Sequence, residues 1–381
     1  MRTKLTMVMI SKLHIFVGLF AICFFIFLVN SYTVYTHTRS VANETLAETK
    51  AIQNIAILSI INGGSDKAKY KTAMLSVQCY ALQNNYTYLQ LNGEDFKTIC
   101  EQRHVLLQRH CIVAHILKTY NFSWVLHVEA DIGVVNEKMR IEEYIKEDVD
   151  LIFYERFFNF EIAAGSYFAK KSDFSVMFLR GWADYEFRLP KTFHNDNLLL
   201  QMWFVELLAP NAPLTQTCWI LWRNALWKNA VKLKSLWKIW SLHTLCCREA
   251  LKSALTPHLF LYTKGNGWVR DSWLTNSHWS QKDFMFHDRK EKRKKHFNGT
   301  QELVLDGPKF DWFDTLKKPL ILDRCTKDEP WDHESALITS EQVIESHLEK
   351  RKKSVEHEYR VHLRQLQEIA TSLNQSIQTL I

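Results

Sequence analysis

The stretch WVLHVEADIGVVN, residues 124–136, decides the fold of this chain. Residues 124–128 are apolar or aromatic, as in a strand that is buried on both faces. Two carboxylates, Glu129 and Asp131, follow at once with one small residue between them. Ligands of open α/β sheets bind beyond the carboxyl ends of the strands. The acid pair therefore predicts a binding crevice at this edge of a sheet.

Strand and helix patterns alternate on both sides of this stretch. Buried or alternating runs predict strands at 55–61, 86–91, 124–128, 149–154, 258–262 and 283–287. Apolar residues at helical spacing predict helices at 67–83, 104–120, 173–187, 195–210 and 217–255. The β-α-β-α-β order of the first half predicts an α/β fold with a doubly wound, mostly parallel sheet.

The N-terminus has the pattern of a membrane anchor. Residues 13–35 contain no charged residue and are long enough to span a bilayer, and Arg2, Lys4 and Lys12 precede them. The positive-inside rule then predicts a cytosolic tail at 1–12, a transmembrane signal anchor at 13–35 and a stem at 36–52. A cleaved signal peptide is the alternative, but no small-x-small cleavage site follows the apolar run. The body, 53–338, and a helical tail, 339–381, would be luminal.

Glycosylation motifs and cysteines agree with a luminal body. The N-x-S/T motif begins at Asn43, Asn85, Asn121, Asn298 and Asn374. Seven cysteines follow the anchor, so in an oxidising lumen several would pair and one would remain free or intermolecular. Their spacing does not give the connectivity.

The charge pattern argues against a nucleic-acid partner. The net charge is +7, but outside one cluster at 289–295 the basic residues are spread along the chain. No recognition motif interleaves them with stacking aromatics.

The tail carries an apolar heptad pattern with two interpretations. Its members are Tyr359, Leu363, Leu366, Ala370, Leu373, Ile377 and Leu380. Three heptads are near the minimum for a coiled coil, which would make the chain a homodimer. The alternative is a helix that packs on the body of its own chain.

The acid pair suits a divalent cation. Mn²⁺ or Mg²⁺ prefers oxygen ligands and can bind phosphate oxygens at open positions. Such an ion can hold a diphosphate leaving group and stabilise its developing charge. A solvated turn is the alternative, since acids are common there.

Several stretches together resemble a known family. They are RHCIVAHIL, ADIGVVN, IEEYI, DLIFYERFFNFEIAAGSYFAKKS, GWADYEFRLPKTFH, GWVRDSW and HWSQKDFMFH. From about residue 53 to 292 the chain resembles a nematode family of type II membrane proteins within the GT-A nucleotide-sugar glycosyltransferases. More distantly it is similar to galactosyl, mannosyl and xylosyl transferases. The resemblance implies a GT-A-like domain at 53–338, in the lumen of the Golgi or ER.

The resemblance also implies roles for particular residues. Asp131 and His287 would bind the metal, and Glu129 would contact the metal or the donor ribose. Asp196 and Asn197 would lie near the anomeric carbon of the donor sugar. The other implied donor contacts are Gly165 and Ser166 at the sugar and Lys290 at the diphosphate. Arg109 could reach the donor, but a salt bridge on a helix surface is its commoner role.

Three positions depart from the family pattern. Glu129 replaces an Asp, HDRK (287–290) replaces HGWK, and HNDN (194–197) is one residue shorter than HGTDN. The first hypothesis is a Mn²⁺- or Mg²⁺-dependent glycosyltransferase that retains anomeric configuration and acts on a glycan. The departures motivate a second, a glycan-binding or scaffolding pseudoenzyme. A third is a structural membrane protein that oligomerises through its tail.

The sequons yield a test of topology. Protein made in a eukaryotic host should gain gel mobility after glycosidase treatment, because a luminal body is accessible to the glycosylation machinery. An unshifted band from a host that glycosylates a control protein would contradict a luminal body.

Overall fold

The computed structural model describes residues 54–63, 66–190, 195–227, 233–252, 257–297, 304–327 and 330–378. The chain divides into two units, 1–53 and 54–381, and only the second contains described residues. The expected cytosolic tail, anchor and stem therefore lie outside the described residues, as do Asn43 and Asn298. Among the helices that are described, none is long and apolar enough to cross a membrane.

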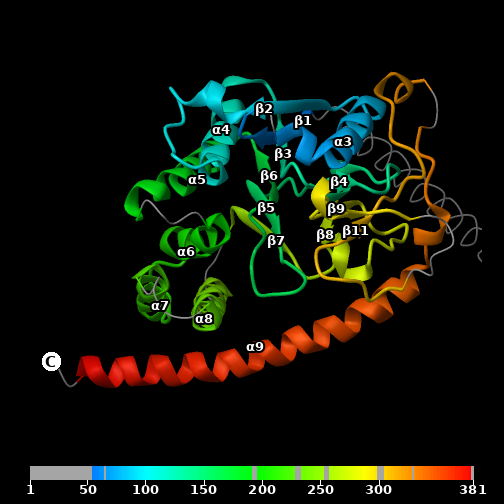
Figure 1. Cartoon of the computed structure of the whole chain (residues 1–381). Coiled ribbons are helices and arrows are strands. Elements are labelled where there is room, and N and C mark those ends of the chain that lie inside the picture. The colour runs from blue at the N-terminus through cyan, green and yellow to red at the C-terminus, as the bar shows by residue number, and fades with distance from the viewer. Residues whose placement is uncertain are drawn as a thin grey trace, which may run out of the picture. The chain divides into compact units, whose positions relative to one another are not determined.

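Strands and helices alternate along the described chain (Figure 1). The main sheet contains β1 (Ile55–Ile61), β2 (Thr87–Asn92), β3 (Trp124–Val128), β5 (Leu151–Tyr154), β6 (Ser166–Lys170) and β7 (Leu259–Tyr262). The helices are α2 (Asp66–Lys69), α3 (Lys71–Gln83), α4 (Val105–Thr119), α5 (Asp173–Asp184), α6 (Asp196–Leu208), α7 (Thr215–Trp227), α8 (Leu233–Lys252) and α9 (Glu341–Gln378). A second sheet contains β4 (Gly133–Val134), β8 (Val269–Asp271) and β9 (Met285–His287). A third contains β10 (Lys294–Lys295) and β11 (Trp312–Phe313).

The main sheet has the order β2-β1-β3-β6-β5-β7. The pairs β1–β2, β1–β3 and β5–β7 are parallel, which confirms the prediction of a mixed α/β fold with a mostly parallel sheet. β6 is the exception, since it runs antiparallel to both β3 and β5. Its connection from β5, residues 155–165, contains no helix. Parallel neighbours need a crossover of about a dozen residues or more, usually helical, so this short connection reverses the chain.

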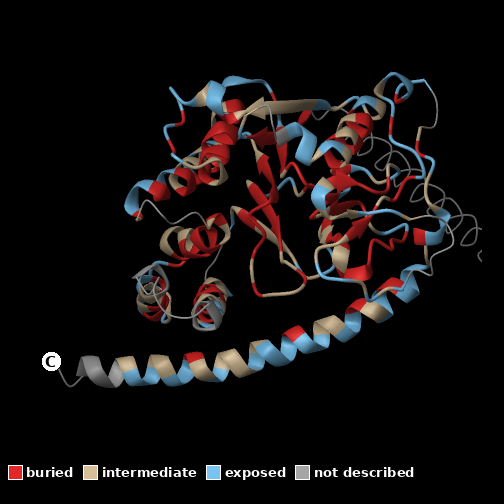
Figure 2. Ribbon diagram, in the orientation of Figure 1, coloured by how far each residue is buried: buried red, intermediate tan, exposed pale blue. Residues whose placement is uncertain are grey.

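The central strands of the sheet are buried (Figure 2). Alternate residues of one strand belong to different cores. In β1, Ala56 and Leu58 join a core with residues of α4 to α9, whereas Ile55 and Ile57 join a core with residues of α3. This follows from the two-residue period of a strand. It also explains why β1 and β3 are almost continuously apolar in sequence.

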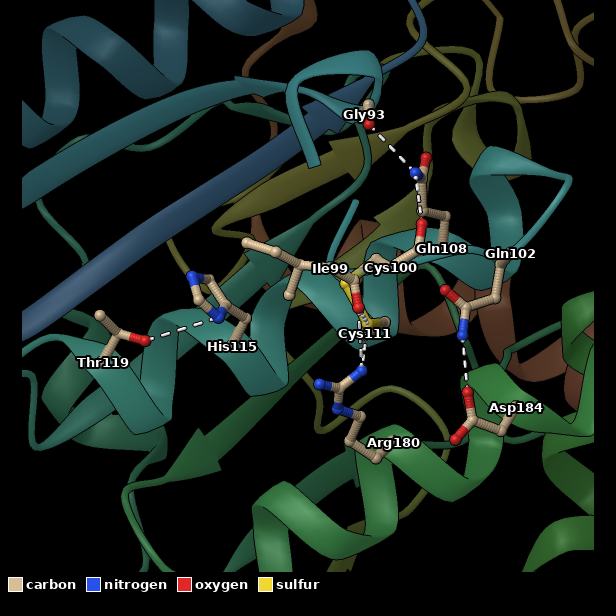
Figure 3. The surroundings of a disulfide bond; sticks show 10 residues. All are labelled: Gly93, Ile99, Cys100, Gln102, Gln108, Cys111, His115, Thr119, Arg180 and Asp184. Carbon is tan, nitrogen blue, oxygen red and sulfur yellow. Dashed lines mark hydrogen bonds between the residues drawn. A yellow bond between two sulfur atoms is a disulfide. The ribbon is translucent and has the colours of Figure 1, made fainter. Parts of the chain in front are cut away.

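Three disulfides join cysteines whose spacing left the pairing open. They are Cys79–Cys325, Cys100–Cys111 and Cys218–Cys246. The expected unpaired cysteine is Cys247, which is buried. Figure 3 shows the surroundings of Cys100–Cys111, where Gln108 donates hydrogen bonds to the carbonyls of Gly93 and Cys100, both at 3.0 Å.

The tail helix α9 packs on the body of its own chain. Leu366 and Val355 are each 1% exposed in the core shared with α4 to α8, and Tyr359 and Leu363 pack against it. The Nζ of Lys252 on α8 also donates a 2.8 Å hydrogen bond to the hydroxyl of Tyr359. Much of the apolar heptad face is thus used within the chain, which confirms the docking alternative for the part of the tail that is described. Leu380 lies outside it.

Docking of α9 gives a quantitative test. Leu366→Ala should lower the unfolding free energy by about 2–5 kcal/mol in urea denaturation, because a buried side chain leaves a cavity. The control Gln367→Ala, at an exposed neighbouring position, should change it by less than about 0.5 kcal/mol. In sedimentation, Leu366→Ala should leave the subunit number unchanged. A change from dimer to monomer would support the coiled coil instead.

Candidate active site

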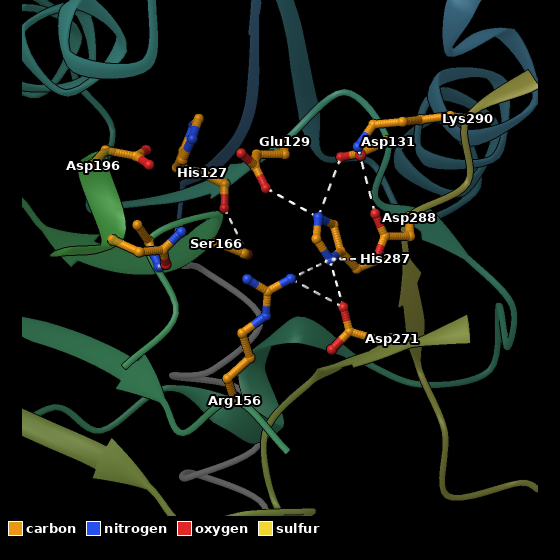
Figure 4. A network of polar contacts seen from close by, with 12 residues as sticks. His127, Glu129, Asp131, Arg156, Ser166, Asp196, Asp271, His287, Asp288 and Lys290 are labelled. Atoms are coloured by element: carbon orange, nitrogen blue, oxygen red, sulfur yellow. Dashed lines mark hydrogen bonds and ion pairs between the residues drawn. The ribbon is translucent and has the colours of Figure 1, made fainter. Parts of the chain in front are cut away.

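The acid pair of the opening stretch lies where the chain leaves β3. Directly afterwards the chain forms β4, which pairs antiparallel with β9 so that Gly133 lies opposite Phe286. This pairing places His287, the last residue of β9, beside Glu129 and Asp131 (Figure 4). The expected meeting of Asp131 with His287, far apart in sequence, is therefore present in the fold.

His287 lies between carboxylates on both sides of its ring. Its Nε2 is 3.2 Å from Oε2 of Glu129 and 3.5 Å from Oδ1 of Asp131. Its Nδ1 is 2.8 Å from Oδ1 of Asp271, the residue opposite it in the β8–β9 register. A carboxylate behind a histidine holds the proton on the near nitrogen and orients the ring. Asp271 therefore directs Nε2 toward Glu129 and Asp131.

The acids and bases of this cluster shift the pKa values of one another. Burial by itself would lower the pKa of His287, but the carboxylates of Asp131 and Asp288 outweigh it and hold that pKa well above its usual value. Burial would raise the pKa of Asp271, but Arg156 and His287 hold it well below its usual range. The protonated imidazole thus supplies the positive charge that the surrounding acids require.

The same residues could hold a metal ion. One ligand atom each from Glu129, Asp131 and His287 lie within 4.8 Å of one another. Carboxylate oxygens with one imidazole nitrogen suit Mn²⁺ better than Ca²⁺, which prefers oxygen alone. Among the described residues a second such group joins His287 to Asp271 and Asp288. The first group fits an ion better, because the Nδ1 side of His287 already bonds Asp271.

Lys290 and Asp288 lie beside the acid pair. The Nζ of Lys290 is 2.9 Å from Oδ2 of Asp131 and 3.4 Å from Oδ1 of Asp288. Despite burial, these two acids raise the pKa of Lys290 above its usual value. Asp288 has a φ of 67°, in the left-handed region that favours glycine. The backbone thus explains the Gly of the HGWK pattern, and Asp288 adds a negative charge beside Lys290.

Arg109 joins the acid pair to α6. Its Nη1 is 2.7 Å from Oε1 of Glu129, and its Nη2 bonds Oδ2 of Asp196. The expected salt bridge on a helix surface is wrong, since Arg109 is only 4% exposed. Although burial raises the pKa of Glu129, Arg109 outweighs it and holds that pKa well below its usual range. Arg109 therefore keeps Glu129 ionised and oriented.

Asp196 and Asn197 begin α6 but face different surroundings. Asp196 is buried against Arg109, and burial raises the pKa of its carboxyl. Oδ1 of Asn197 accepts a 2.9 Å hydrogen bond from the main chain of Ala164, and Asn197 lines a small cavity at the acid pair. Of the two expected sugar contacts, only Asn197 reaches this cavity.

Gly165 and Ser166 also differ in role. A Cβ at Gly165 would collide with the carboxylate of Glu129, so any larger residue here would displace that carboxylate from its present position. Ser166 is fully buried: its hydroxyl donates to the carbonyl of His127 at 2.7 Å and accepts from Nε1 of Trp268 at 2.9 Å. Ser166 thus serves the fold, and the described structure does not support its expected contact with a sugar.

The cavity at the acid pair is about 20 Å³. That is room for an ion or one water and too little for a sugar. Its wall contains residues from β5, β8, β9 and α6, including Glu129, Tyr154, Arg156, Gly165, Asn197 and His287.

Two residues of the cluster, Asp271 and Arg156, were not predicted from the sequence. Asp271 ends β8, and Arg156 follows the end of β5 closely. Nη2 of Arg156 lies 3.2 Å from Oδ1 of Asp271 and 3.3 Å from Nδ1 of His287. Arg156 obeys the rule that located the acid pair, namely a charged residue just beyond a strand end, and the expected strand at 149–154 could have revealed it. Asp271 could not be found in this way, because no strand was expected at β8.

Comparisons with known proteins give one family and several loose structural likenesses. A family model described as "Protein of unknown function, DUF273" matches residues 77–303. No curated protein matches. Among solved structures, the chain is similar to a glycosyltransferase involved in the glycosylation of the major capsid of PBCV-1, at 16% identity and a TM-score of 0.31, covering 37% of this chain and 72% of that one. It is similar to the glycosyltransferase GlyE of Streptococcus pneumoniae TIGR4 at 13% identity and a TM-score of 0.31, covering 52% of this chain and 64% of that one. Superpositions this loose establish neither fold nor function.

The contact between Gly165 and Glu129 can be tested by a double-mutant cycle. Gly165→Ala should destabilise the protein by about 1–3 kcal/mol in urea denaturation, because the new methyl group meets the Glu129 carboxylate. Glu129→Ala removes that carboxylate, so the double variant should lose less stability than the two single variants together. Additive losses would show that the two residues are not in contact.

Proposed function

The chain belongs to the DUF273 family of proteins of unknown function, and we propose that it is a metal-dependent glycosyltransferase. It would move a sugar from a nucleotide-sugar donor to a glycan acceptor. One observation carries the proposal: Glu129, Asp131 and His287 meet at the carboxyl edge of a parallel-rich sheet, with Lys290 beside them. With a metal ion bound, this cluster would attract a diphosphate, and it lies where α/β sheets bind ligands.

Glu129, Asp131 and His287 would hold the ion, Mn²⁺ or Mg²⁺. A bound ion of this kind supplies Lewis acidity to diphosphate oxygens. His287 must then be neutral, so metal binding would release the proton that the acids now hold on its ring. Asp271 would keep the ring oriented in both states, because its hydrogen bond is to the far nitrogen.

Lys290 would contribute to binding of the leaving diphosphate. Its ammonium group lies beside Asp131, and the side chain of Lys290 is 30% exposed. A Lys acts there as a point charge that needs no fixed geometry. The negative charge of Asp288 weakens this contribution, since it lies at 3.4 Å from the same ammonium.

The sugar end of the donor would lie against Asn197 and Gly165. Both line the cavity at the acid pair. We assign Asp196 and Arg109 a positioning role, because together they fix Glu129 from behind. Since the cavity is too small for a sugar, donor binding requires its walls to move apart. By analogy with the resembled transferases, the reaction would retain configuration, with the released phosphate accepting the proton of the acceptor hydroxyl.

The proposed location is the lumen of the Golgi or ER, with a type II anchor at 13–35. Three disulfides among the described residues are typical of an oxidising compartment. The described sequons Asn85 and Asn121 are exposed, as glycosylated asparagines must be.

A glycan-binding pseudoenzyme is the second candidate, and Asp288 favours it. The carboxylate of Asp288 lies within 4 Å of both Lys290 and Arg293, two cations that a diphosphate would need. This candidate predicts glycan binding without metal-dependent nucleotide binding.

The test is a thermal shift of the full chain with UDP, GDP and CDP, each with and without Mn²⁺. A ligand at 100 times its dissociation constant should add about 2.7 kcal/mol of stability. Asp131→Asn and His287→Ala should each weaken Mn²⁺-dependent binding at least tenfold, about 1.4 kcal/mol. The double variant should be little worse than either single one, since both remove ligands of one ion.

Matched controls are Asp323→Asn and His357→Ala, at exposed positions away from the cluster, which should bind as the wild type does. Glu129→Asp restores the residue of the family pattern and should retain or improve binding. Absence of any Mn²⁺-dependent shift in the wild type would reject the enzyme and leave the pseudoenzyme.

A further inference from the structure

A second and much larger cavity adjoins the acid cluster. Its volume is about 560 Å³, within the range of pockets that hold small ligands. Four segments form its wall: the end of β5 with the residues that follow, the turn and strand 264–270, residues 280–285, and the first turns of α9. The residues on which its chemistry depends are Phe157, Ile344, Leu348, Glu341, Glu345 and Glu349.

The two cavities share part of their walls. Tyr154, Phe157, Val269 and Arg270 line both the large cavity and the small one at Glu129 and His287. A molecule in the large cavity is therefore separated from the acid cluster only by side chains common to both. When the small cavity widens for a donor sugar, the two can become continuous.

The wall of the large cavity is apolar on one side and acidic at its rim. Phe157, Ile344 and Leu348 belong to one buried apolar cluster, and all three line the cavity. Glu341, Glu345 and Glu349 are four residues apart on α9, so they lie along one face of the helix. Apolar surface suits the C–H face of a pyranose ring, and carboxylates accept hydrogen bonds from its hydroxyl groups.

The charges of the wall disfavour an anionic ligand. Each described Lys or Arg of the lining has an acid or carbonyl partner. Arg270 is 2.7 Å from Asp283, and Lys282 bonds both Glu341, at 2.7 Å, and Glu345, at 3.0 Å. Since these cations are already paired, none of the described lining is left to pair with a carboxylate or sulfate.

We propose that this cavity binds the acceptor, and that the acceptor is the uncharged end of a glycan. The inference rests on the proposed glycosyltransferase function and names its second substrate. An acceptor hydroxyl held here would bond to the anomeric carbon of the donor sugar. The bond from that carbon to the diphosphate oxygen breaks, its electron pair leaves with the diphosphate, and the hydroxyl proton passes to the released phosphate.

α9 supplies one wall of this site, and it lies beyond the residues 77–303 that the family model matches. Acceptor choice would therefore be a property that the tail adds to the domain. This also accounts for a tail helix whose first turns face a cavity while its later turns pack on α7 and α8.

The test compares two tryptophan variants of the full chain. Ser346 is exposed and lines the cavity, so Ser346→Trp should fill it. Val343, also exposed on α9, does not line it, so Val343→Trp is the matched control. Binding is measured on an array of neutral, sialylated and sulfated oligosaccharides. The wild type and Val343→Trp should bind neutral glycans, and Ser346→Trp should bind them at least tenfold more weakly.

A thermal shift with UDP, GDP and CDP in Mn²⁺ separates the two proposals. Ser346→Trp should lose glycan binding with its nucleotide shift intact. Equal glycan binding by Ser346→Trp and the wild type, a preference for anionic glycans, or nucleotide binding without any glycan binding would overturn the acceptor site alone. Loss of both kinds of binding in the wild type would overturn the proposed function itself.

Discussion

The site depends on a balance of buried charges around His287. Four acids, Glu129, Asp131, Asp271 and Asp288, surround one imidazole in a partly or fully buried cluster. An uncompensated charge in such surroundings costs several kcal/mol. Arg109 and Arg156 each pair with one of these acids and Lys290 pairs with two, but the imidazole lies among all four. A positive charge at the centre of the cluster therefore stabilises it. Either the protonated imidazole of His287 or a bound metal ion can supply that charge.

The cluster forms because β3, β8 and β9 end at the same place in the fold. β3 delivers the acid pair, β8 delivers Asp271, and β9 delivers His287 and the residues after it. The short β4–β9 ladder is the decisive link, because it turns the chain after Asp131 back against the late strand. Gly165 completes the arrangement, since its missing Cβ leaves the space that the longer side chain of Glu129 occupies. The replacement of Asp by Glu in the family pattern is thus accommodated sterically.

The tail helix α9 contacts the segment that leads into this site. Nη2 of Arg351 on α9 donates to the carbonyl of Phe158 at 3.3 Å, and the ring of Phe160 contacts that of Tyr359 at 5.5 Å between centroids. These contacts hold the connection 155–165, which carries Arg156 into the cluster and Phe157 into the large cavity. A movement of this connection that widened the small cavity would therefore also change its contacts with α9.

Sequence patterns alone determined the α/β class, most strands and helices, the crevice at Glu129 and Asp131, and, through resemblance, the partner His287. Periodicity and strand-end position are local properties, so one chain segment suffices to read them. Only the tertiary structure decided the reversal of β6, the disulfide pairs, the burial of Arg109 and Ser166, the docking of α9 and the entry of Arg156 and Asp271 into the cluster. Each of these depends on which distant segments lie together, and the balance of buried charge cannot be known before they meet.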